Sequence, residues 1–384
     1  MSRRDFVLHR LAPTLALALL LPRLAGAQTA ATTYVAFGDS ITAGVGDETK
    51  RGGYPPRLQD LLVARSVSAE VRNEGLPSED TSGGVTRINR VLRDGDDVLL
   101  LMEGTNDVEN VSIETTTFNL TEIARRAGDR GLRTVYATPF PRHPAAGKDG
   151  QNLLTGQMAG AIRELAFSQQ RQLVDPFEVF FVETPNFASF YADGDRVHPR
   201  AAGYDIMARA FADVLTNVDS VLPVTGLVDP FNDQKNVPAS TPLRIDLYDF
   251  GAGLDLANTK LSVNGVDVET PLSGSQRKVE IRYTPPAPFA GVVIVRLRSR
   301  DLATPQHLLD REITQFTIAG TTFLRGDIDL NGRVDGVDLL AFAPIFGAQR
   351  SDARFRTFAD INGDGAVNGQ DLAILASNFG KSSF

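Results

Sequence analysis

The chain has 384 residues, a formal net charge of −8, and a composition that is 42% hydrophobic and 22% charged. That length suits two or three domains with cores of their own, while the acidic balance and the lack of basic, aromatic-rich patches exclude a nucleic-acid-binding surface. Cysteine is absent, which excludes a disulfide framework, and beyond the N-terminal segment no stretch approaches the roughly 20 apolar residues that a membrane span requires.

The first residues have the pattern of an export signal. The pair Arg3 and Arg4 precedes an apolar run over 11–21 and the small-residue site Ala25-Gly26-Ala27. We therefore expect residues 1–27 to be a signal peptide, of the twin-arginine type, that sends the protein to the extracellular space or the cell surface. An ordinary signal peptide or a short anchor is the alternative.

Residues 30–218 are predicted to form an α/β domain, because short β-rich segments alternate there with longer helical patterns. The predicted strands are 34–37, 69–72, 97–102, 133–137 and 172–175. The predicted helices are 56–65, 84–93, 117–131, 153–170 and 201–215. Right-handed crossovers of this kind place helices on both faces of a parallel sheet, so we expect a three-layer, flavodoxin-like fold.

One serine lies where the first predicted strand ends. Ser40 stands in Gly38-Asp39-Ser40-Ile41-Thr42-Ala43-Gly44, directly after the apolar segment 34–37. This is a suitable place for a nucleophile, although a serine after a glycine turn is also consistent with a helix cap. The motif therefore needs partners elsewhere in the chain to indicate catalysis.

A histidine base is the first partner that a serine nucleophile needs. The chain has four histidines, and three of them lie in the export segment, after the fourth strand or in the later β-rich region: His9, His143 and His307. His198 remains, three residues after Asp195, which can orient its imidazole. The pair precedes the last predicted helix and can therefore reach the carboxyl edge of the sheet; a surface turn with a local hydrogen bond is the alternative.

Two further loops leave the same edge of the predicted sheet. Asn73-Glu74-Gly75 follows the second strand, and Glu103-Gly104-Thr105-Asn106-Asp107 follows the third. The backbone N–H of Gly75 and the side-chain amide of Asn106 are the kind of donors that an oxyanion hole requires.

Residues 222–319 have strand-like segments without long helices. These segments are 243–248, 259–263, 278–283, 291–297 and 312–318. Turn signals such as Asn264-Gly265 separate them, so we expect an Ig-like β-sandwich. We expect a spacer rather than a carbohydrate-binding module, because the chain has no tryptophan for stacking on sugars.

Residues 324–384 contain a duplicated acidic loop, each copy followed by an apolar helix pattern. Oxygen ligands recur at positions 1, 3, 5, 9 and 12, which is the spacing that Ca²⁺ demands, and a glycine occupies the sharp turn. In the first loop the side-chain ligands are Asp327, Asp329, Asn331, Asp335 and Asp338, with a main-chain carbonyl from Arg333. In the second they are Asp360, Asn362, Asp364, Asn368 and Asp371, with a main-chain carbonyl from Ala366. We expect this tail to be disordered without metal and to fold on binding two structural Ca²⁺ ions.

Four segments of the α/β domain carry a resemblance to a known family: Gly38-Asp39-Ser40, the Gly75 loop, Gly104-Thr105-Asn106-Asp107, and Asp195 with His198. Taken together and in this order, they resemble the conserved segments of the SGNH hydrolases of the GDSL esterase/lipase family. The resemblance implies that Ser40 is the nucleophile, His198 the general base and acid, and Asp195 the residue that orients it. It further implies that the backbone N–H groups of Ser40 and Gly75 and the side chain of Asn106 form the oxyanion hole, with no cofactor for catalysis.

The duplicated tail resembles a type I dockerin, a small α-helical module that binds Ca²⁺. That resemblance implies a cohesin partner in a polysaccharide-degrading assembly. The positions that usually carry partner recognition hold Gly336-Val337 and Gly369-Gln370, which differ from the hydroxyl-rich pairs of many cellulosomal members.

These features lead to the hypothesis of an exported serine esterase that acts on carboxylic esters, with acetylated polysaccharide as the suggested substrate. A lysophospholipase or lipase is the alternative within the family. A binding or scaffold protein with an inert hydrolase domain is the alternative of another class.

Overall fold

The computed structural model describes residues 30–108, 110–143, 149–183, 187–192, 194–219, 222–319, 324–329, 332–349, 352 and 354–382. The predicted signal peptide over 1–27 and the predicted calcium ligand Asn331 lie outside the described residues. Within the described part of the chain, every helix is too short or too polar to cross a bilayer.

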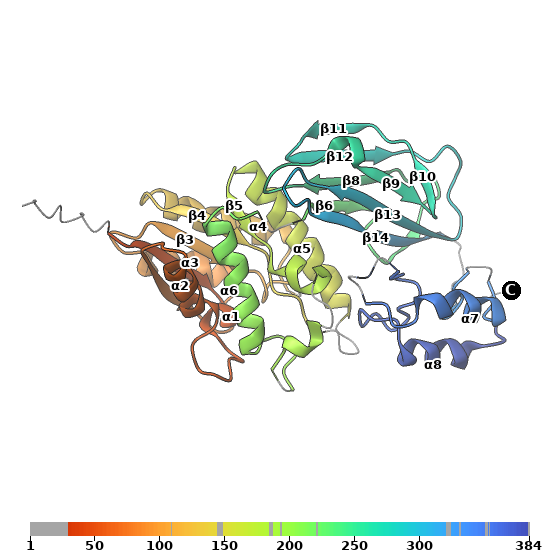
Figure 1. The fold of residues 1–384 in the computed structure, drawn as a ribbon, viewed down its shortest axis with the longest axis horizontal. Coiled ribbons are helices and arrows are strands. Elements are labelled where there is room, and N and C mark those ends of the chain that lie inside the picture. The colour runs from red at the N-terminus through yellow and green to blue at the C-terminus, as the bar shows by residue number, and fades with distance from the viewer. Residues whose placement is uncertain are drawn as a thin grey trace, which may run out of the picture. The chain divides into compact units, whose positions relative to one another are not determined.

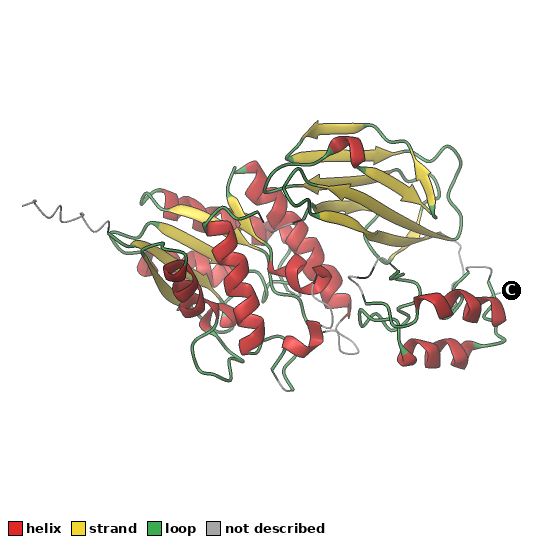
Figure 2. Cartoon of the chain, viewed as in Figure 1, coloured by secondary structure: helices red, strands yellow, loops and turns green. Residues whose placement is uncertain are grey.

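The first domain is built on a parallel sheet of five strands in the order β2-β1-β3-β4-β5 (Figures 1 and 2). Its strands are β1 (Thr32–Gly38), β2 (Ala69–Gly75), β3 (Val98–Met102), β4 (Arg133–Ala137) and β5 (Gln172–Val174). Its helices are α1 (Ser40–Ala43), α2 (Tyr54–Ala64), α3 (Thr81–Val91), α4 (Ile113–Gly128), α5 (Asp149–Ser168) and α6 (Ala201–Leu215). A π-helical turn (Glu178–Glu183) and a 3₁₀ turn (Phe187–Phe190) precede α6.

Alternate residues of the central strands enter two separate hydrophobic cores, one on each face of the sheet. Tyr34 and Leu100 pack with residues of α2 and α6 on one face, whereas Phe37 and Leu99 pack with α3, α4 and α5 on the other. This burial on both faces explains why the strands are nearly continuous apolar runs. The arrangement confirms the predicted three-layer, flavodoxin-like fold.

Four helices, α2 to α5, begin earlier than the sequence pattern predicted, and polar side chains cap two of them. The Asp80 side chain accepts a hydrogen bond from the backbone N–H of Gly83 and starts α3. The Ser112 side chain accepts from the backbone N–H of Thr115 and starts α4. Each cap satisfies a donor that would otherwise lack a partner in the first helical turn.

The β-rich region forms two sheets, in the orders β10-β9-β13-β14-β7 and β11-β12-β8-β6. Their strands are β6 (Val224–Asp229), β7 (Gln234–Val237), β8 (Leu243–Tyr248), β9 (Lys260–Val263), β10 (Val266–Val268), β11 (Leu272–Ser275), β12 (Lys278–Tyr283), β13 (Val292–Arg300) and β14 (Leu308–Ile318). A short 3₁₀ turn (Leu256–Asn258) precedes β9. The sequence pattern missed β6, β7, β10 and β11, which are edge strands with few buried side chains and therefore a weak hydrophobic alternation.

The C-terminal region contains α7 (Gly336–Phe342), a 3₁₀ turn (Ala343–Ile345) and α8 (Gly369–Asn378). Each helix starts with a capping box, formed by Asp335 with Asp338 and by Asn368 with Asp371. Isolated β-bridges join Arg333 to Ser382 and Gln349 to Ala366. The two repeats share one small core that includes Ile328, Val334, Phe342, Val367 and Leu375.

Candidate functional site

Ser40 is the first residue of α1, directly after the turn that ends β1. The Asp39 side chain caps this helix by accepting a hydrogen bond from the backbone N–H of Ile41 at 2.8 Å. Gly38 is required at the turn, because a Cβ atom there would lie 2.3 Å from the carbonyl oxygen of Met102 on β3. The residue that caps the helix is thus Asp39 and not Ser40. The serine side chain is therefore available for other contacts.

The structure brings Ser40, His198 and Asp195 into one hydrogen-bonded chain. His198 Nε2 lies 2.9 Å from Ser40 Oγ, and His198 Nδ1 lies 2.6 Å from Asp195 Oδ2. The imidazole therefore contacts the serine with one nitrogen and the carboxylate with the other. This is the geometry in which a histidine can take a proton from a serine hydroxyl.

Asp195 is held in place by its own loop. Its Oδ1 accepts hydrogen bonds from the backbone N–H of Val197 at 2.8 Å and of His198 at 3.0 Å. Partial burial acts to raise the pKa of Asp195, but these backbone hydrogen bonds and the contact with the His198 ring outweigh it and lower the pKa. The carboxylate is therefore ionised wherever His198 has to act as a base.

The amide of Asn106 is oriented by a hydrogen bond in which Nδ2 donates to the carbonyl oxygen of Glu79 at 2.7 Å. An amide nitrogen carries two hydrogens, so this contact fixes the side chain and leaves a second N–H to donate. The geometry thus suits Asn106 as a donor to a substrate oxygen.

Gly75 is placed differently from Asn106. Its backbone N–H donates to Asn73 Oδ1 at 2.9 Å, and a backbone amide carries only one hydrogen. A Cβ at this position would lie 2.1 Å from the backbone nitrogen of Ala43. Glycine is therefore needed here so that β2 can pass close to α1, and the role of its N–H as an oxyanion donor stays a prediction.

Asp107 anchors the loop that carries Asn106, a role that the sequence did not reveal. Its buried carboxylate accepts from the Thr81 backbone N–H at 3.0 Å, the Thr81 hydroxyl at 2.5 Å and the Thr116 hydroxyl at 2.8 Å. The Arg142 guanidinium donates to the carbonyl oxygen of Thr105 at 2.8 Å on the same loop. The only sequence signal for this anchor is an aspartate directly after the predicted oxyanion residue Asn106.

Two buried carboxyl groups near the candidate triad, Asp39 and Glu103, were also missed by the sequence analysis. Burial raises the pKa of Asp39 to about 6, against the lowering effect of its hydrogen bonds and of the nearby His198 and Arg142 charges. Burial, together with the charges of Asp39 and Glu79, raises the pKa of Glu103 well above its usual value. Both residues stand directly after apolar strands, and only the folded structure reveals that they are enclosed.

In the first calcium loop, Asp327, Asp329 and Asp338 each offer a carboxylate oxygen, and these oxygens lie within 4.8 Å of one another. Asp338 Oδ1 also accepts from the backbone N–H of Ile328 at 2.6 Å, which folds the loop back onto α7. Gly332 has φ of 84°, as the predicted sharp turn requires.

The second loop repeats this arrangement with Asp360, Asp364 and Asp371, and its turn residue Gly365 has φ of 87°. Asp371 Oδ1 accepts from the backbone N–H of Asn362 at 3.0 Å. The donors in both loops are carboxylate oxygens within reach of one ion, so the residues present fit Ca²⁺.

The other predicted ligands have local partners in the structure. Asp335 and Asn368 cap α7 and α8 through side-chain oxygens that accept from backbone N–H groups. Arg333 and Ala366 lie in the β-bridges that join the two repeats.

Comparison with known proteins supports both assignments. Residues 36–206 match the model of the GDSL-like lipase/acylhydrolase family, and residues 325–379 match the type I dockerin domain. No curated protein matches the chain.

Similar solved structures include Axe2, an acetylxylan esterase from Geobacillus stearothermophilus. It is 22% identical, with a TM-score of 0.40, over 47% of this chain and 93% of that one. A lipase/acylhydrolase from Enterococcus faecalis is 22% identical, with a TM-score of 0.41, over 47% of this chain and 93% of that one. Both alignments cover about half of the present chain.

The triad geometry and the family match agree over the same residues, and so do the acidic loops and the dockerin match. The chain therefore carries an esterase domain that matches the GDSL-like lipase/acylhydrolase model at residues 36–206 and a type I dockerin domain at residues 325–379.

Proposed function

We propose that the protein hydrolyses carboxylic esters through an acyl-enzyme formed on Ser40. The observation that carries this proposal is the hydrogen-bonded chain from Ser40 Oγ through His198 to Asp195, at 2.9 Å and 2.6 Å. In the first step Ser40 Oγ attacks the ester carbonyl carbon while His198 Nε2 takes the hydroxyl proton. His198 then gives this proton to the departing alcohol.

In the second step a water molecule attacks the acyl-enzyme, and the same nitrogen takes its proton. The bond to Ser40 Oγ breaks, the carboxylic acid leaves, and the proton returns to the serine. Asp195 accepts from His198 Nδ1 throughout and stabilises the imidazolium that forms in each step.

We propose that the free N–H of the Asn106 amide stabilises the negative charge that develops on the carbonyl oxygen, together with the backbone N–H of Ser40. The contact of Asn106 with Glu79 orients this amide before substrate binds, and a donor fixed in advance costs no reorganisation during the reaction.

Hydrolysis of p-nitrophenyl acetate tests the catalytic assignment. Ser40→Ala should remain folded and lose at least about a thousandfold in turnover, as expected when a triad member is removed. Asn106→Ala should lose roughly a hundredfold. Ser68→Ala, which changes an exposed serine elsewhere in the same domain, is the matched control and should keep wild-type turnover.

Full turnover in Ser40→Ala would refute Ser40 as the nucleophile, and a wild type without turnover would favour a scaffold role. An unchanged rate in Asn106→Ala would remove that residue from the oxyanion site.

We further propose that the substrate is an acetyl ester on a polysaccharide. The support is the dockerin domain in the same chain, because modules of this kind attach enzymes to assemblies that degrade polysaccharides. A panel of acetylated xylan, acetylated pectin and p-nitrophenyl esters from acetate to palmitate tests this. Release of acetate from the polymers, with a rate that falls as the acyl chain lengthens, is expected; a preference for long chains would indicate a lipase.

We also propose that the protein is exported, that its tail holds two Ca²⁺ ions and that it binds a cohesin-type protein. The dockerin domain has two clusters of three aspartates, one in each loop, and this supports the number of ions. Calorimetric titration with Ca²⁺ tests the number of ions, and a second titration with a cohesin in the presence of Ca²⁺ tests cohesin binding. A titration that fits one ion would contradict the proposed pair of Ca²⁺ ions. The absence of cohesin binding by the Ca²⁺-loaded chain would contradict the proposed partner.

A further inference from the structure

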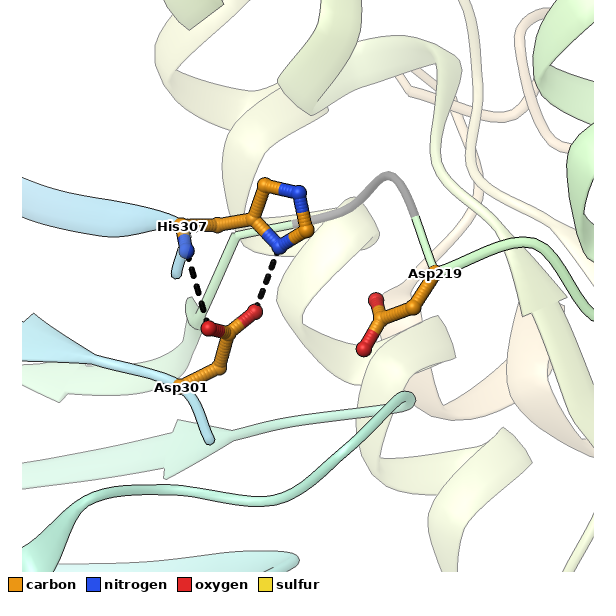
Figure 3. A group of neighbouring side chains, drawn as sticks. All are labelled: Asp219, Asp301 and His307. Atoms are coloured by element: carbon orange, nitrogen blue, oxygen red, sulfur yellow. Dashed lines mark hydrogen bonds and ion pairs between the residues drawn. The ribbon is translucent and has the colours of Figure 1, made fainter. Parts of the chain in front are cut away.

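A second cluster of possible metal ligands lies on the turns at one end of the β-rich region, outside the dockerin loops. Asp301 and His307 flank the turn between β13 and β14, and Asp219 belongs to the segment that follows α6 (Figure 3). Each of the three offers one ligand atom, and these atoms lie within 4.8 Å of one another. Figure 3 shows the Asp219 carboxylate facing the paired Asp301 and His307 side chains.

Asp301 and His307 are tightly joined. His307 Nδ1 lies 2.5 Å from Asp301 Oδ2, and the His307 backbone N–H donates to Asp301 Oδ1 at 2.8 Å. Asp301 is fully buried. The imidazole and the carboxylate thus share one proton at a position that a cation can take instead, since metal ions replace the protons of their ligands.

Asp219 is positioned by the turn that follows β8. Its Oδ2 accepts from the backbone N–H of Ala252 at 2.8 Å. The neighbouring Gly251 must be glycine for this contact, because a Cβ there would lie 2.2 Å from the same oxygen. The turn therefore has a shape that accommodates the carboxylate.

A third carboxylate, Asp249, provides an independent indication of a ligand. Its side chain is 1% exposed, and its Oδ1 accepts from the backbone N–H groups of Gly251 at 2.8 Å and Gly253 at 2.7 Å. Its Oδ2 is buried with no hydrogen-bond partner among the described residues. A buried carboxylate oxygen left in this state is costly unless a cation or a proton neutralises it.

The charges around Asp249 point to a cation. Burial raises its pKa, and the negative charges of Asp219 and Asp301 raise it further, which places all three carboxylates in one electrostatic cluster. Within the described ranges, no lysine or arginine forms an ion pair with any of the three. Among the described residues, the His307 imidazole is thus the one side chain of opposite charge paired with the cluster, which leaves excess negative charge there.

We propose that Asp219, Asp301 and His307 bind one divalent transition-metal ion, of the Mn²⁺ or Zn²⁺ type, beside the buried carboxylate of Asp249. Carboxylates alone would suit Ca²⁺, but an imidazole nitrogen is a ligand for transition metals rather than for Ca²⁺. The site thus differs in chemistry from the dockerin loops, whose donors are oxygens. The bound ion would link the segment after α6 to two turns of the β-rich region.

Equilibrium dialysis of the full chain against Mn²⁺, and separately against Zn²⁺, tests this site. Millimolar Ca²⁺ is present throughout to fill the dockerin loops, and the bound metal is counted per chain. The wild type should retain one transition-metal ion per chain. Asp219→Asn and His307→Gln should each weaken its binding by at least about tenfold, the usual minimum for the loss of one ligand contact.

Asp267→Asn is the matched control, because it removes an exposed carboxylate of the same region that pairs with Arg298. This variant should bind the ion as the wild type does. Circular dichroism of each variant shows whether it is folded. Asp219→Asn should be folded, because Asp219 is only partly buried.

Three results would overturn the proposal. One is a wild-type chain that retains neither Mn²⁺ nor Zn²⁺ in excess Ca²⁺. The second is undiminished binding in folded Asp219→Asn and His307→Gln. The third is a third Ca²⁺ ion bound in preference to both metals, which would refute the transition-metal assignment.

Discussion

Replacing Asp39 by asparagine should remove a pH-dependent loss of stability from the hydrolase domain. Asp39 is 1% exposed, next to Ser40, and its pKa in the folded protein is about 6, against 3.8 for an unperturbed aspartate. The folded chain therefore holds a proton on Asp39 over a pH range in which the unfolded chain has released it. Asparagine keeps the side-chain oxygen that caps α1 but carries no charge.

The sign and size of the effect follow from this difference in pKa. Because the pKa is raised in the folded state, the stabilisation from the proton is complete below pH 3.8 and is lost as the pH rises through about 6. Each unit of difference corresponds to about 1.4 kcal/mol, so the wild type should lose up to about 3 kcal/mol over this window. Asp39→Asn should not lose this stability. Its free energy of unfolding, compared with that of the wild type, should therefore increase as the pH rises.

Urea unfolding of both proteins at pH 4, 5, 6 and 7 measures this. Pulsed hydrogen exchange of peptides from β1 and β3 reports the hydrolase domain separately from the others. Asp267→Asn is the control, since an exposed aspartate should show no such trend. A stability difference between Asp39→Asn and wild type that stays constant from pH 4 to pH 7 would refute the reasoning, as would a variant that is less stable at pH 7.

Three further perturbations test the packing and the loops. Phe211→Ala removes a fully buried ring stacked on Tyr54 at 4.5 Å and should lower the free energy of unfolding by about 3 to 5 kcal/mol; a loss below about 1 kcal/mol in urea unfolding would contradict the assigned packing. Asp107→Ala leaves three donors without their acceptor and should cost roughly 3 kcal/mol as well as esterase turnover, so wild-type urea unfolding and turnover would exclude the anchoring role. Removal of Ca²⁺ by EGTA should open residues 324–382 of the full chain to limited proteolysis while the hydrolase domain stays resistant, and Asp371→Asn should do the same in part; identical digestion patterns with Ca²⁺ and EGTA would refute metal-dependent folding.

The sequence predicted the alternating architecture well because both faces of the sheet are covered. Strands such as β3 are continuous apolar runs flanked by amphipathic helices, and such local patterns need no knowledge of distant contacts. The edge strands of the β-rich region, such as β11, were missed because three of the four residues of that strand are exposed.

The candidate triad could be selected from the sequence because only one histidine was eligible, and the fold then places His198 beside Ser40. What the sequence could not provide is the environment of other polar residues. The burial of Asp39, the three contacts of Asp107 and the approach of Asp219 to Asp301 all depend on segments that meet only after folding. Gly75 was chosen for a free N–H, and only the structure reveals that Asn73 already accepts it.

The β-bridges of the dockerin domain have a consequence for how it responds to calcium. Arg333 in the first loop pairs with Ser382 after the second helix, while Ala366 in the second loop pairs with Gln349 after the first. Each loop is thus held closed by residues of the opposite repeat. If each loop holds one ion, as proposed, an ion that leaves one loop releases the segment that holds the other. Ca²⁺ should then bind and leave cooperatively, and the domain should respond to calcium over a narrow range of concentration.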